Sequence, residues 1–534
     1  MESQFRCFLR RFSKSVSPCQ SQHQSVRPYG QQQLKPVISG ATSSVISPNH
    51  IVESGIPEVY IPDVTLDEYI WANVDKWSDK IAMECGLSGR KYTYGQCRLM
   101  TRRFASALLK SGMKPGDVIA MVLPNVPEFP VAFLGANAAG LSVTLINPLY
   151  TPDEISKQLL DAEVKAVVTI SMFVPLVKAA SASAQISLKN LIVIGEAEEG
   201  CHTFMSMVKD DGSAYPKHAR RDPKEEIAAL PYSSGTTGKP KGVMLSHYNM
   251  VANICEGVVS DWCNFHETTY DFQEVFGVVL PFFHIYSLNA ILLGGLSVGA
   301  KVVCLPKFDP DMYIKMLADY KPTFLHTVPP LLGFVATNPE IKNKYLERAH
   351  TIICGGAPAG RVLIEKTLER FSFSNPLFQE GFGMTETSPV VCMLKTTSGI
   401  SKLGSCGTPI PMTQVAVVDI GTGESLGPNK TGELYIRGPQ VAPSELEDLL
   451  RKHPKVLDCA VIGVPDEASG ELPRAYIVGR PNVSISETDI HSYVEDKVAA
   501  YKQLKGGVHF VESIPKNPSG KILRKDLKAA ALGL

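Results

Sequence analysis

Apolar residues follow two alternating periodicities from about Ile61 onward. Short apolar runs predict buried strands, and the stretches between them have the spacing of helices with one apolar face. Strands are expected at 117–123, 142–146 and 166–170, and helices at 99–112, 130–140 and 153–161. Further strands are expected at 278–280, 301–305 and 351–354. This alternation predicts βαβ units, and therefore parallel sheets covered by helices on both faces.

The pattern changes from Gln414. Residues 415–419 and 432–437 read as antiparallel strands joined by turns, and Ser444-Glu445-Leu446-Glu447 is a capping box that starts a helix. A strand at 456–464 and a helix at 486–497 follow. The predicted fold class is α/β, with a large N-terminal domain, a small β-subdomain and a small α+β C-terminal domain. We expect a separate segment at 1–47, the N-terminal domain at 48–440 and a shortened C-terminal domain at 441–534.

The first 47 residues differ in composition from the rest of the chain. Apolar residues from Phe5 to Val16 follow helical spacing, basic residues lie mostly off that stripe, and the region up to Ile51 has six basic residues and one acid. This is typical of a mitochondrial transit peptide, and a disordered tail of a cytoplasmic protein is the alternative. The final Leu-Gly-Leu is not the Ser-Lys-Leu peroxisomal signal.

Composition excludes several classes of protein. The 53 basic and 53 acidic residues give a formal net charge of zero, which excludes binding to nucleic acid mainly by bulk charge. The 12 cysteines form no Cys-x-x-Cys pair, so neither a zinc ribbon nor a disulfide framework is indicated. No uninterrupted apolar run reaches bilayer length. At 534 residues, two or more domains are expected.

A glycine- and hydroxyl-rich loop with two lysines is the strongest chemical signal. It follows an apolar run, and its uncovered backbone N–H groups and ammonium groups are suited to holding phosphate. It is not a Walker loop, because Ser233 stands where that motif has its first Gly and Pro240 follows the Lys. The candidate phosphate-binding residues are Ser233, Ser234, Gly235, Thr236, Thr237, Gly238, Lys239 and Lys241.

Four other segments carry weaker signals. In the run 381–387, Thr385 and Glu386 are suited to Mg²⁺ and phosphate, and Phe382 between Gly381 and Gly383 could lie against a purine. Gly355-Gly356-Ala357-Pro358 allows close approach of the backbone to a ligand. His284 among aromatic residues and Lys521 after a Pro-Ser-Gly turn read, in isolation, as a packed histidine and a basic tail.

Taken in order, these segments resemble adenylate-forming acyl-CoA ligases, in the branch of 4-coumarate–CoA ligase and firefly luciferase. The similarity runs from about Ile51 to the C-terminus. It implies a two-step reaction in which a carboxylic acid attacks the α-phosphate of Mg-ATP, and coenzyme A then displaces AMP from the acyl-adenylate. The expected small-molecule partners are therefore a carboxylic acid, ATP, Mg²⁺ and CoA, while the oligomeric state is not readable.

The resemblance also implies roles for individual residues. The loop from Ser233 to Lys241 would hold the β- and γ-phosphates, Thr385 and Glu386 would bind phosphate and Mg²⁺, and Gly381 and Phe382 would contact the adenine. His284 would border the carboxylate of the acid, and Lys521 would neutralise the α-phosphate. The acyl pocket would be lined by residues 253–258, 355–358 and 383–391. Ile353 stands where plant phenylpropanoid ligases carry Lys, so an aliphatic acid is as acceptable as a hydroxycinnamate.

The chain departs from the family pattern after Gln440. The family continues there with a Thr-Gly-Asp element, an Asp-Arg-Leu-Lys hinge and a Lys-Gly-Phe loop, whereas this chain passes directly to Val441-Ala442-Pro443-Ser444. A ribose-binding carboxylate and the hinge between the two half-reactions are therefore missing. We expect an internally deleted isoform with impaired turnover.

Three other functions remain as alternatives at this stage. The deleted chain could be a nucleotide-binding protein without turnover, or a luciferase-like monooxygenase that shares the first half-reaction. Gly295-Leu296-Ser297-Val298-Gly299 also matches the nucleophile motif of serine hydrolases, which requires a strand before the Ser and a helix after it. A strand expected at 301–305 opposes that interpretation.

Overall fold

The structure is a computed structural model. It describes residues 45–46, 50–55, 58–185, 190–196, 198–216, 222–233, 241–259, 262–396, 402–419, 422, 424–442, 450, 453–466, 470–481, 483–495, 503–515 and 527. The chain divides into two compact units, Met1–Val415 with Ile436–Ala442, and Ala416–Tyr435 with Pro443–Leu534. The predicted capping box at 444–447 and nearly all of segment 1–47 lie outside the described residues.

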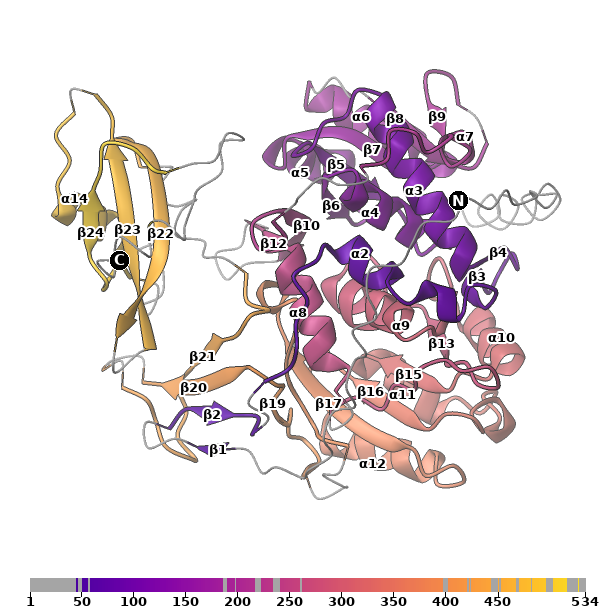
Figure 1. The fold of residues 1–534 in the computed structure, drawn as a ribbon. Coiled ribbons are helices and arrows are strands. Elements are labelled where there is room, and N and C mark those ends of the chain that lie inside the picture. The colour runs from indigo at the N-terminus through magenta and orange to yellow at the C-terminus, as the bar shows by residue number, and fades with distance from the viewer. Residues whose placement is uncertain are drawn as a thin grey trace. The chain divides into compact units, whose positions relative to one another are not determined.

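The first sheet of the larger unit has the strand order β11-β10-β6-β5-β7-β8-β9 (Figure 1). Its central strands are parallel, whereas β11 and β12 pair with β10 in the antiparallel sense. Its strands are β5 (Val118–Val122), β6 (Ser142–Ile146), β7 (Val164–Ile170), β8 (Asn190–Ile194), β9 (His202–Thr203), β10 (Ile227–Ser233), β11 (Lys241–Gly242) and β12 (Leu245–Ser246).

Both faces of this sheet are apolar because successive residues of a strand point to opposite sides. In β5, Ile119 and Met121 belong to the main core, whereas Ala120 and Val122 belong to a second cluster. The second cluster includes Ile155 of α5, and the main core includes residues of α3 and α4. The covering helices are α3 (Tyr94–Lys110), α4 (Phe129–Ala138), α5 (Pro152–Asp161), α6 (Val174–Ser183) and α7 (Phe204–Met207).

The second sheet has the strand order β19-β18-β17-β16-β15-β13-β14-β3-β4. The run from β17 to β3 is parallel, and the edge strands are antiparallel. Its strands are β3 (Ile81–Cys85), β4 (Lys91–Thr93), β13 (Val275–Val278), β14 (Lys301–Cys304), β15 (Phe324–Thr327), β16 (Thr351–Cys354), β17 (Leu377–Gly383), β18 (Val390–Met393) and β19 (Thr408–Pro409).

Helices and short turns connect and cover this second sheet. Several begin at a side chain that accepts a backbone N–H: Ser246 at α8 and Asp309 at α10 are examples. The helices are α2 (Leu66–Trp71), α8 (His247–Gly257), α9 (Gly294–Ser297), α10 (Pro310–Tyr320), α11 (Pro329–Thr337) and α12 (Arg361–Arg370). A π-helix, η4 (Tyr286–Leu293), and the short helices η2 (Val74–Lys76), η5 (Asn343–Tyr345) and η6 (Thr385–Thr387) also belong to this group. The short helix η3 (Ser171–Phe173) instead follows β7 of the first sheet.

A third sheet joins strands from the start of the described chain to strands that come after the second sheet in the sequence, in the order β1-β2-β20-β21. The strands β1 (Val45–Ile46), β2 (Val52–Glu53), β20 (Gln414–Val418) and β21 (Glu433–Arg437) are described. Val52 of β2 pairs with Val415 of β20 in antiparallel register. The start of the described chain is thereby bound to a segment more than 350 residues later.

The smaller unit contains a three-stranded sheet in the order β22-β23-β24. The strands are β22 (Val456–Asp466), β23 (Gly470–Gly479) and β24 (Val508–Phe510), and α14 spans Glu487–Glu495. Cys459, Ala475 and Ile477 from the sheet and Ile490 and Val494 from α14 are buried together. This unit therefore has an α+β core of its own.

The α/β fold class is confirmed, with three corrections. The strand expected at 278–280 lies at Val275–Val278, because its pairing with β14 begins at Val275 and the chain turns at Pro281. The helix expected from residue 99 begins at Tyr94, because Thr93 caps it by accepting a hydrogen bond from the backbone of Gln96. The sheets also carry antiparallel edge strands where only parallel ones were expected.

Candidate active site

A largely apolar cavity lies where the parallel strands of the second sheet end. The segments that follow β13 and β16 and the end of β17 all contribute to its lining, because carboxyl ends of parallel strands share one edge of a sheet. Helix α8 closes another side with Asn253 and Ile254, together with Val258 directly after the helix. The predicted site residues that line it are His284, Gly356, Gly381, Phe382, Gly383 and Thr385.

His284 lines this cavity, and a backbone hydrogen bond indicates which of its ring nitrogens carries the proton. The backbone N–H of Tyr286 donates to its Nδ1 at 3.2 Å, so in the neutral ring the proton is on Nε2. Desolvation by the surrounding protein lowers the pKa of His284, although the ring keeps access to solvent through the cavity. The neutral side chain can therefore donate one hydrogen bond to an acidic ligand without adding charge.

Glycine is required at position 383 by close backbone approach. A Cβ there would meet the carbonyl of Pro389, and the same carbonyl accepts a hydrogen bond from the backbone of Met384 at 2.9 Å. This turn holds η6, which carries Thr385 and Glu386. On the neighbouring strand, Asn253 of α8 donates to the carbonyl of Val390 at 2.9 Å and accepts from its N–H at 3.2 Å.

The carboxylate of Glu386 is joined to the start of the predicted phosphate loop. The hydroxyl of Ser233, the last residue of β10, donates to Oε1 of Glu386 at 3.2 Å. Lys241 pairs with Ser233 across β10 and β11, so both ends of the loop meet at this point. The structure thus brings together Ser233, Lys241 and Glu386, which are far apart in the sequence.

Other predicted residues are exposed or lie outside the described part of the chain. Gly356, Ala357 and Pro358 follow β16 at the surface, and Gly356 has φ of 80°, which favours glycine. Of this group only Gly356 lines the cavity. The residues outside the described part are Ser234, Gly235, Thr236, Thr237, Gly238, Lys239 and Lys521.

Sequence reasoning missed two polar residues at this cavity, whereas Asn253 belongs to the range 253–258 that was expected to line the acyl pocket. His326 is buried and lines the cavity, and neither ring nitrogen has a hydrogen-bond partner among the described residues. The hydroxyl of Tyr286 also lacks a partner there. Asn253 orients β18, as described above. A histidine within the apolar strand 324–327 was the one signal in the sequence, because a polar side chain in a buried strand needs an explanation.

The comparisons with known proteins decide the family. Residues 70–444 match the family described as AMP-binding enzyme, and residues 445–521 match the AMP-binding enzyme C-terminal domain. The chain belongs to the AMP-binding enzyme family. It is 36% identical to a 4-coumarate:CoA ligase of Petunia hybrida, over 90% of this chain and 96% of that protein. It is 35% identical to a 4-coumarate–CoA ligase of Petroselinum crispum, with the same shares covered.

Solved structures share the fold. A long-chain-fatty-acid–CoA ligase from Archaeoglobus fulgidus superimposes with a TM-score of 0.66, at 24% identity, over 87% of this chain and 99% of that one. Together with the family match, this confirms that the chain is an adenylate-forming acyl-CoA ligase of the 4-coumarate–CoA ligase type. ATP, Mg²⁺ and CoA, the expected small molecules, are those with which enzymes of this family work.

The hydrolase interpretation is not supported by the fold. Ser297 ends helix α9 and is followed by strand β14, which is the reverse of the strand–Ser–helix order that a nucleophile elbow requires. Its hydroxyl donates to the carbonyl of Gly294 at 2.7 Å. Within the described ranges, no helix has the length and apolarity that a membrane span needs.

Proposed function

We propose that the apolar cavity binds the acyl part of a carboxylic acid, and that ATP and Mg²⁺ bind beside it at Ser233, Thr385 and Glu386. The hydrogen bond between Ser233 and Glu386 supports this most directly, because it joins the start of the phosphate loop to the acidic motif. Mg²⁺ held by the Glu386 carboxylate would offset phosphate charge while the acid attacks. Adenylyl transfer depends chiefly on such positioning and charge stabilisation.

His284 would position the carboxylate of the acid. Since Nδ1 accepts from the backbone of Tyr286, Nε2–H is the group that can donate to a carboxylate oxygen. Because the pKa of His284 is lowered, the ring stays neutral near pH 7 and does not hold the nucleophile as a tight ion pair.

The cavity favours an acid with an apolar body and a hydrogen-bonding group. The relatives named above are 4-coumarate–CoA ligases. The side chain of Ile353 lines the cavity and offers no hydrogen bond. The ring nitrogens of His326 and the hydroxyl of Tyr286, which have no partner among the described residues, can each form one with a ligand. A buried polar group left without a partner costs about 1–3 kcal/mol, so a hydroxylated acid should be preferred. A panel comparing 4-coumarate, cinnamate and hexanoate by thermal shift tests this, and a preference for cinnamate or hexanoate would contradict it.

We further propose that this chain lacks an internal segment at Gln440/Val441 and turns over poorly. The alignment with the petunia ligase extends over 536 positions, more than the 534 residues of the chain, yet it includes only 90% of them. Residues of the relative must therefore face gaps in this chain. This supports a missing block, and the sequence motifs place it after Gln440.

The local structure explains why the junction would impair turnover. Gln440 is fully buried, its side chain donates to Thr413 Oγ1 at 2.7 Å, and its carbonyl accepts from Ser388 at 2.9 Å. Asn249 donates to the carbonyls of Pro439 and Val441 at 2.8 and 3.2 Å. The larger unit ends at Ala442, so these contacts hold its last residues where the missing segment would begin. Rotation of a domain between half-reactions requires hinge residues that can change their backbone angles.

The experiment compares this chain with a version that carries the segment of the petunia relative between Gln440 and Val441. Pyrophosphate release and thioester formation are measured separately, together with ATP binding by calorimetry. We expect ATP binding by both chains and at least a tenfold gain in thioester formation by the restored one. Equal turnover of the two chains would contradict the proposed impairment, and absence of ATP binding in both would overturn the site itself.

We also propose a mitochondrial location, on the basis of the basic amphipathic segment at 1–47. Fusion of these residues to a fluorescent protein should direct it to mitochondria. A matched fusion in which Arg6, Arg10 and Arg11 are replaced by Gln should remain in the cytoplasm. A cytoplasmic signal from both fusions would favour the disordered-tail alternative.

A further inference from the structure

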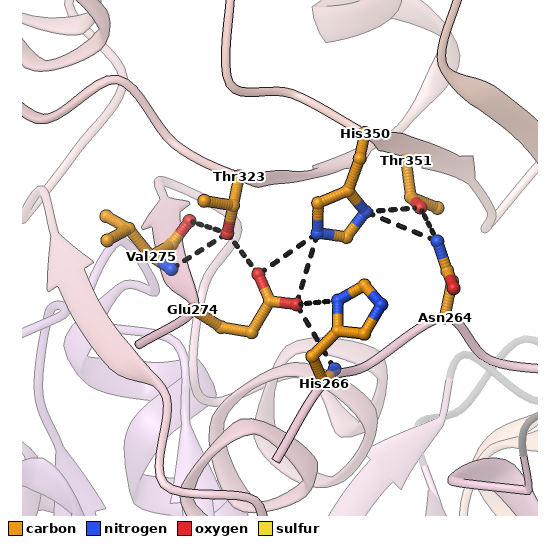
Figure 2. A network of polar contacts seen from close by, with 7 residues as sticks. All are labelled: Asn264, His266, Glu274, Val275, Thr323, His350 and Thr351. Atoms are coloured by element: carbon orange, nitrogen blue, oxygen red, sulfur yellow. Dashed lines mark hydrogen bonds and ion pairs between the residues drawn. The ribbon is translucent and has the colours of Figure 1, made fainter. Parts of the chain in front are cut away.

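A cluster of two histidines and one glutamate lies at the opposite edge of the second sheet. Glu274, Thr323 and His350 directly precede the adjacent parallel strands β13, β15 and β16 (Figure 2). They therefore lie at the amino ends of these strands, whereas the cavity lies at the carboxyl ends. None of them lines the cavity, and the proposed ligase reaction does not use them.

Three potential ligand atoms converge in this cluster. His266 Nδ1 lies 2.8 Å from Glu274 Oε1, and His350 Nε2 lies 3.1 Å from the same oxygen. Tetrahedral coordination with bonds of about 2.0–2.2 Å places ligand atoms roughly 3.4 Å apart. The two histidine nitrogens would therefore each move away from Glu274 Oε1 by well under 1 Å, and all three ligand atoms already lie within 4.8 Å of one another.

From this geometry we propose that His266, Glu274 and His350 form a binding site for a divalent transition-metal ion, with Zn²⁺ as the preferred occupant. Two imidazoles and one carboxylate are a ligand set that zinc accepts, with water in the fourth position. Mg²⁺ prefers oxygen ligands, so this site differs in chemistry from the Mg²⁺ that accompanies ATP.

The surrounding residues supply the outer hydrogen bonds that metal ligands need. Thr351 Oγ1 lies 2.9 Å from His350 Nδ1, so it can accept that N–H when Nε2 binds the metal. Asn264 donates to the same hydroxyl oxygen at 3.1 Å and keeps it in place. The hydroxyl of Thr323 donates to Glu274 Oε2, and the backbone N–H of His266 donates to Oε1 at 3.1 Å, so both oxygens of the carboxylate are held in place (Figure 2). Oε1, which faces both imidazoles, keeps a second lone pair that could bind a metal.

The cluster is held by the fold and is open to solvent on one side. The N–H of His350 donates to the carbonyl of Thr323, and the N–H of Thr323 donates to that of Val275, so the sheet fixes both positions. Phe265 packs edge-on against Phe324 at 4.8 Å and places the next residue, His266. The Glu274 side chain is fully buried, while those of His266 and His350 are 52% and 27% exposed, which gives a metal ion a way in.

Without a metal ion, the same contacts would form a hydrogen-bond network around a buried carboxylate. The following experiment distinguishes this network from a metal-binding site. The full chain is treated with EDTA, the chelator is removed, and Zn²⁺ is added by calorimetric titration. We expect one high-affinity equivalent and a rise in the thermal midpoint. His266→Ala should weaken this binding at least tenfold, and its exposed ring makes unfolding by this change unexpected.

The matched control is His491→Ala. That residue forms an exposed pair with Glu487 on α14, with Nε2 3.3 Å from Oε1, and among the described residues this pair belongs to no group of three potential metal ligands. Its replacement should leave zinc affinity unchanged. Co²⁺ used in place of Zn²⁺ should give a visible absorption band without thiolate charge transfer, which separates this site from the cysteines. Absence of zinc binding, equal affinity of the His266→Ala variant, or a thiolate spectrum would overturn the proposal.

Discussion

At the scale of single residues, the environment of a side chain decides its chemistry more than its type does. Cys392 and Cys406 are both thiols, but their side chains hydrogen-bond to each other, which raises the pKa of buried Cys392 and lowers that of exposed Cys406 to about 7. Cys201 is half-buried, and desolvation raises its pKa. The thiolate is the reactive form, so Cys406 should react first among the described cysteines.

This predicts the outcome of alkylation by iodoacetamide. The reaction at Cys406 should reach half its maximal rate near pH 7, and Cys392→Ala should move that midpoint toward the ordinary value of about 8.5. At pH 7 the variant should react roughly tenfold more slowly at Cys406. Peptide mass spectrometry resolves the sites, with Cys201 as the internal reference. An unchanged rate at Cys406 would show that Cys392 does not activate it.

At the scale of elements, backbone approach fixes the part of the site around β17 and η6. Gly383→Ala should displace the turn that leads to Glu386, since the added Cβ would meet the Pro389 carbonyl. We expect a loss of about 1–3 kcal/mol of stability and at least tenfold weaker ATP binding, measured by thermal unfolding and calorimetry. Gly333→Ala in α11 is the control, because its nearest contact would be 3.9 Å away. It should be neutral or stabilising.

Most elements could be predicted from the sequence because their patterns are local. Residues 142–146 form β6 with the expected bounds, since a continuous apolar run of that length suits a strand buried on both faces. The hydrogen bond between Ser233 and Glu386 could not be predicted in this way. It depends on tertiary packing between segments 153 residues apart, and only the family resemblance suggested their proximity. The cluster at Glu274 gave no local pattern, since His350 lies 76 residues after Glu274 in the sequence.

At the scale of the whole molecule, buried titratable groups make stability depend on pH. His326 stacks on Phe324 with ring centroids 4.6 Å apart, and burial lowers its pKa to about 3, with Glu274 partly opposing the shift. The folded chain keeps this ring neutral, while the unfolded chain protonates it near pH 6.5. The contribution of neutral His326 to the free energy of unfolding is therefore complete above about pH 6.5, and it is lost as the pH falls toward 3.

The expected cost of acidification at this one residue is up to roughly 5 kcal/mol, at about 1.36 kcal/mol for each pKa unit. His326→Phe should flatten the dependence of the urea midpoint on pH between about 6.5 and 4. His491→Ala, at an exposed position, should leave the slope unchanged. The same slope in the His326→Phe chain would show that other groups cause the acid sensitivity.

Strand β16 carries a site at each of its ends. It has four residues, and His350 and Gly355, which flank it, are five steps apart, or roughly 16 Å at about 3.3 Å per residue. A metal ion at one end and an acyl substrate at the other would then both contact residues that flank the same strand, which is paired with β15 and β17 on its two sides. By thermodynamic linkage, if zinc tightens the binding of the acid by some factor, the acid must tighten the binding of zinc by that factor.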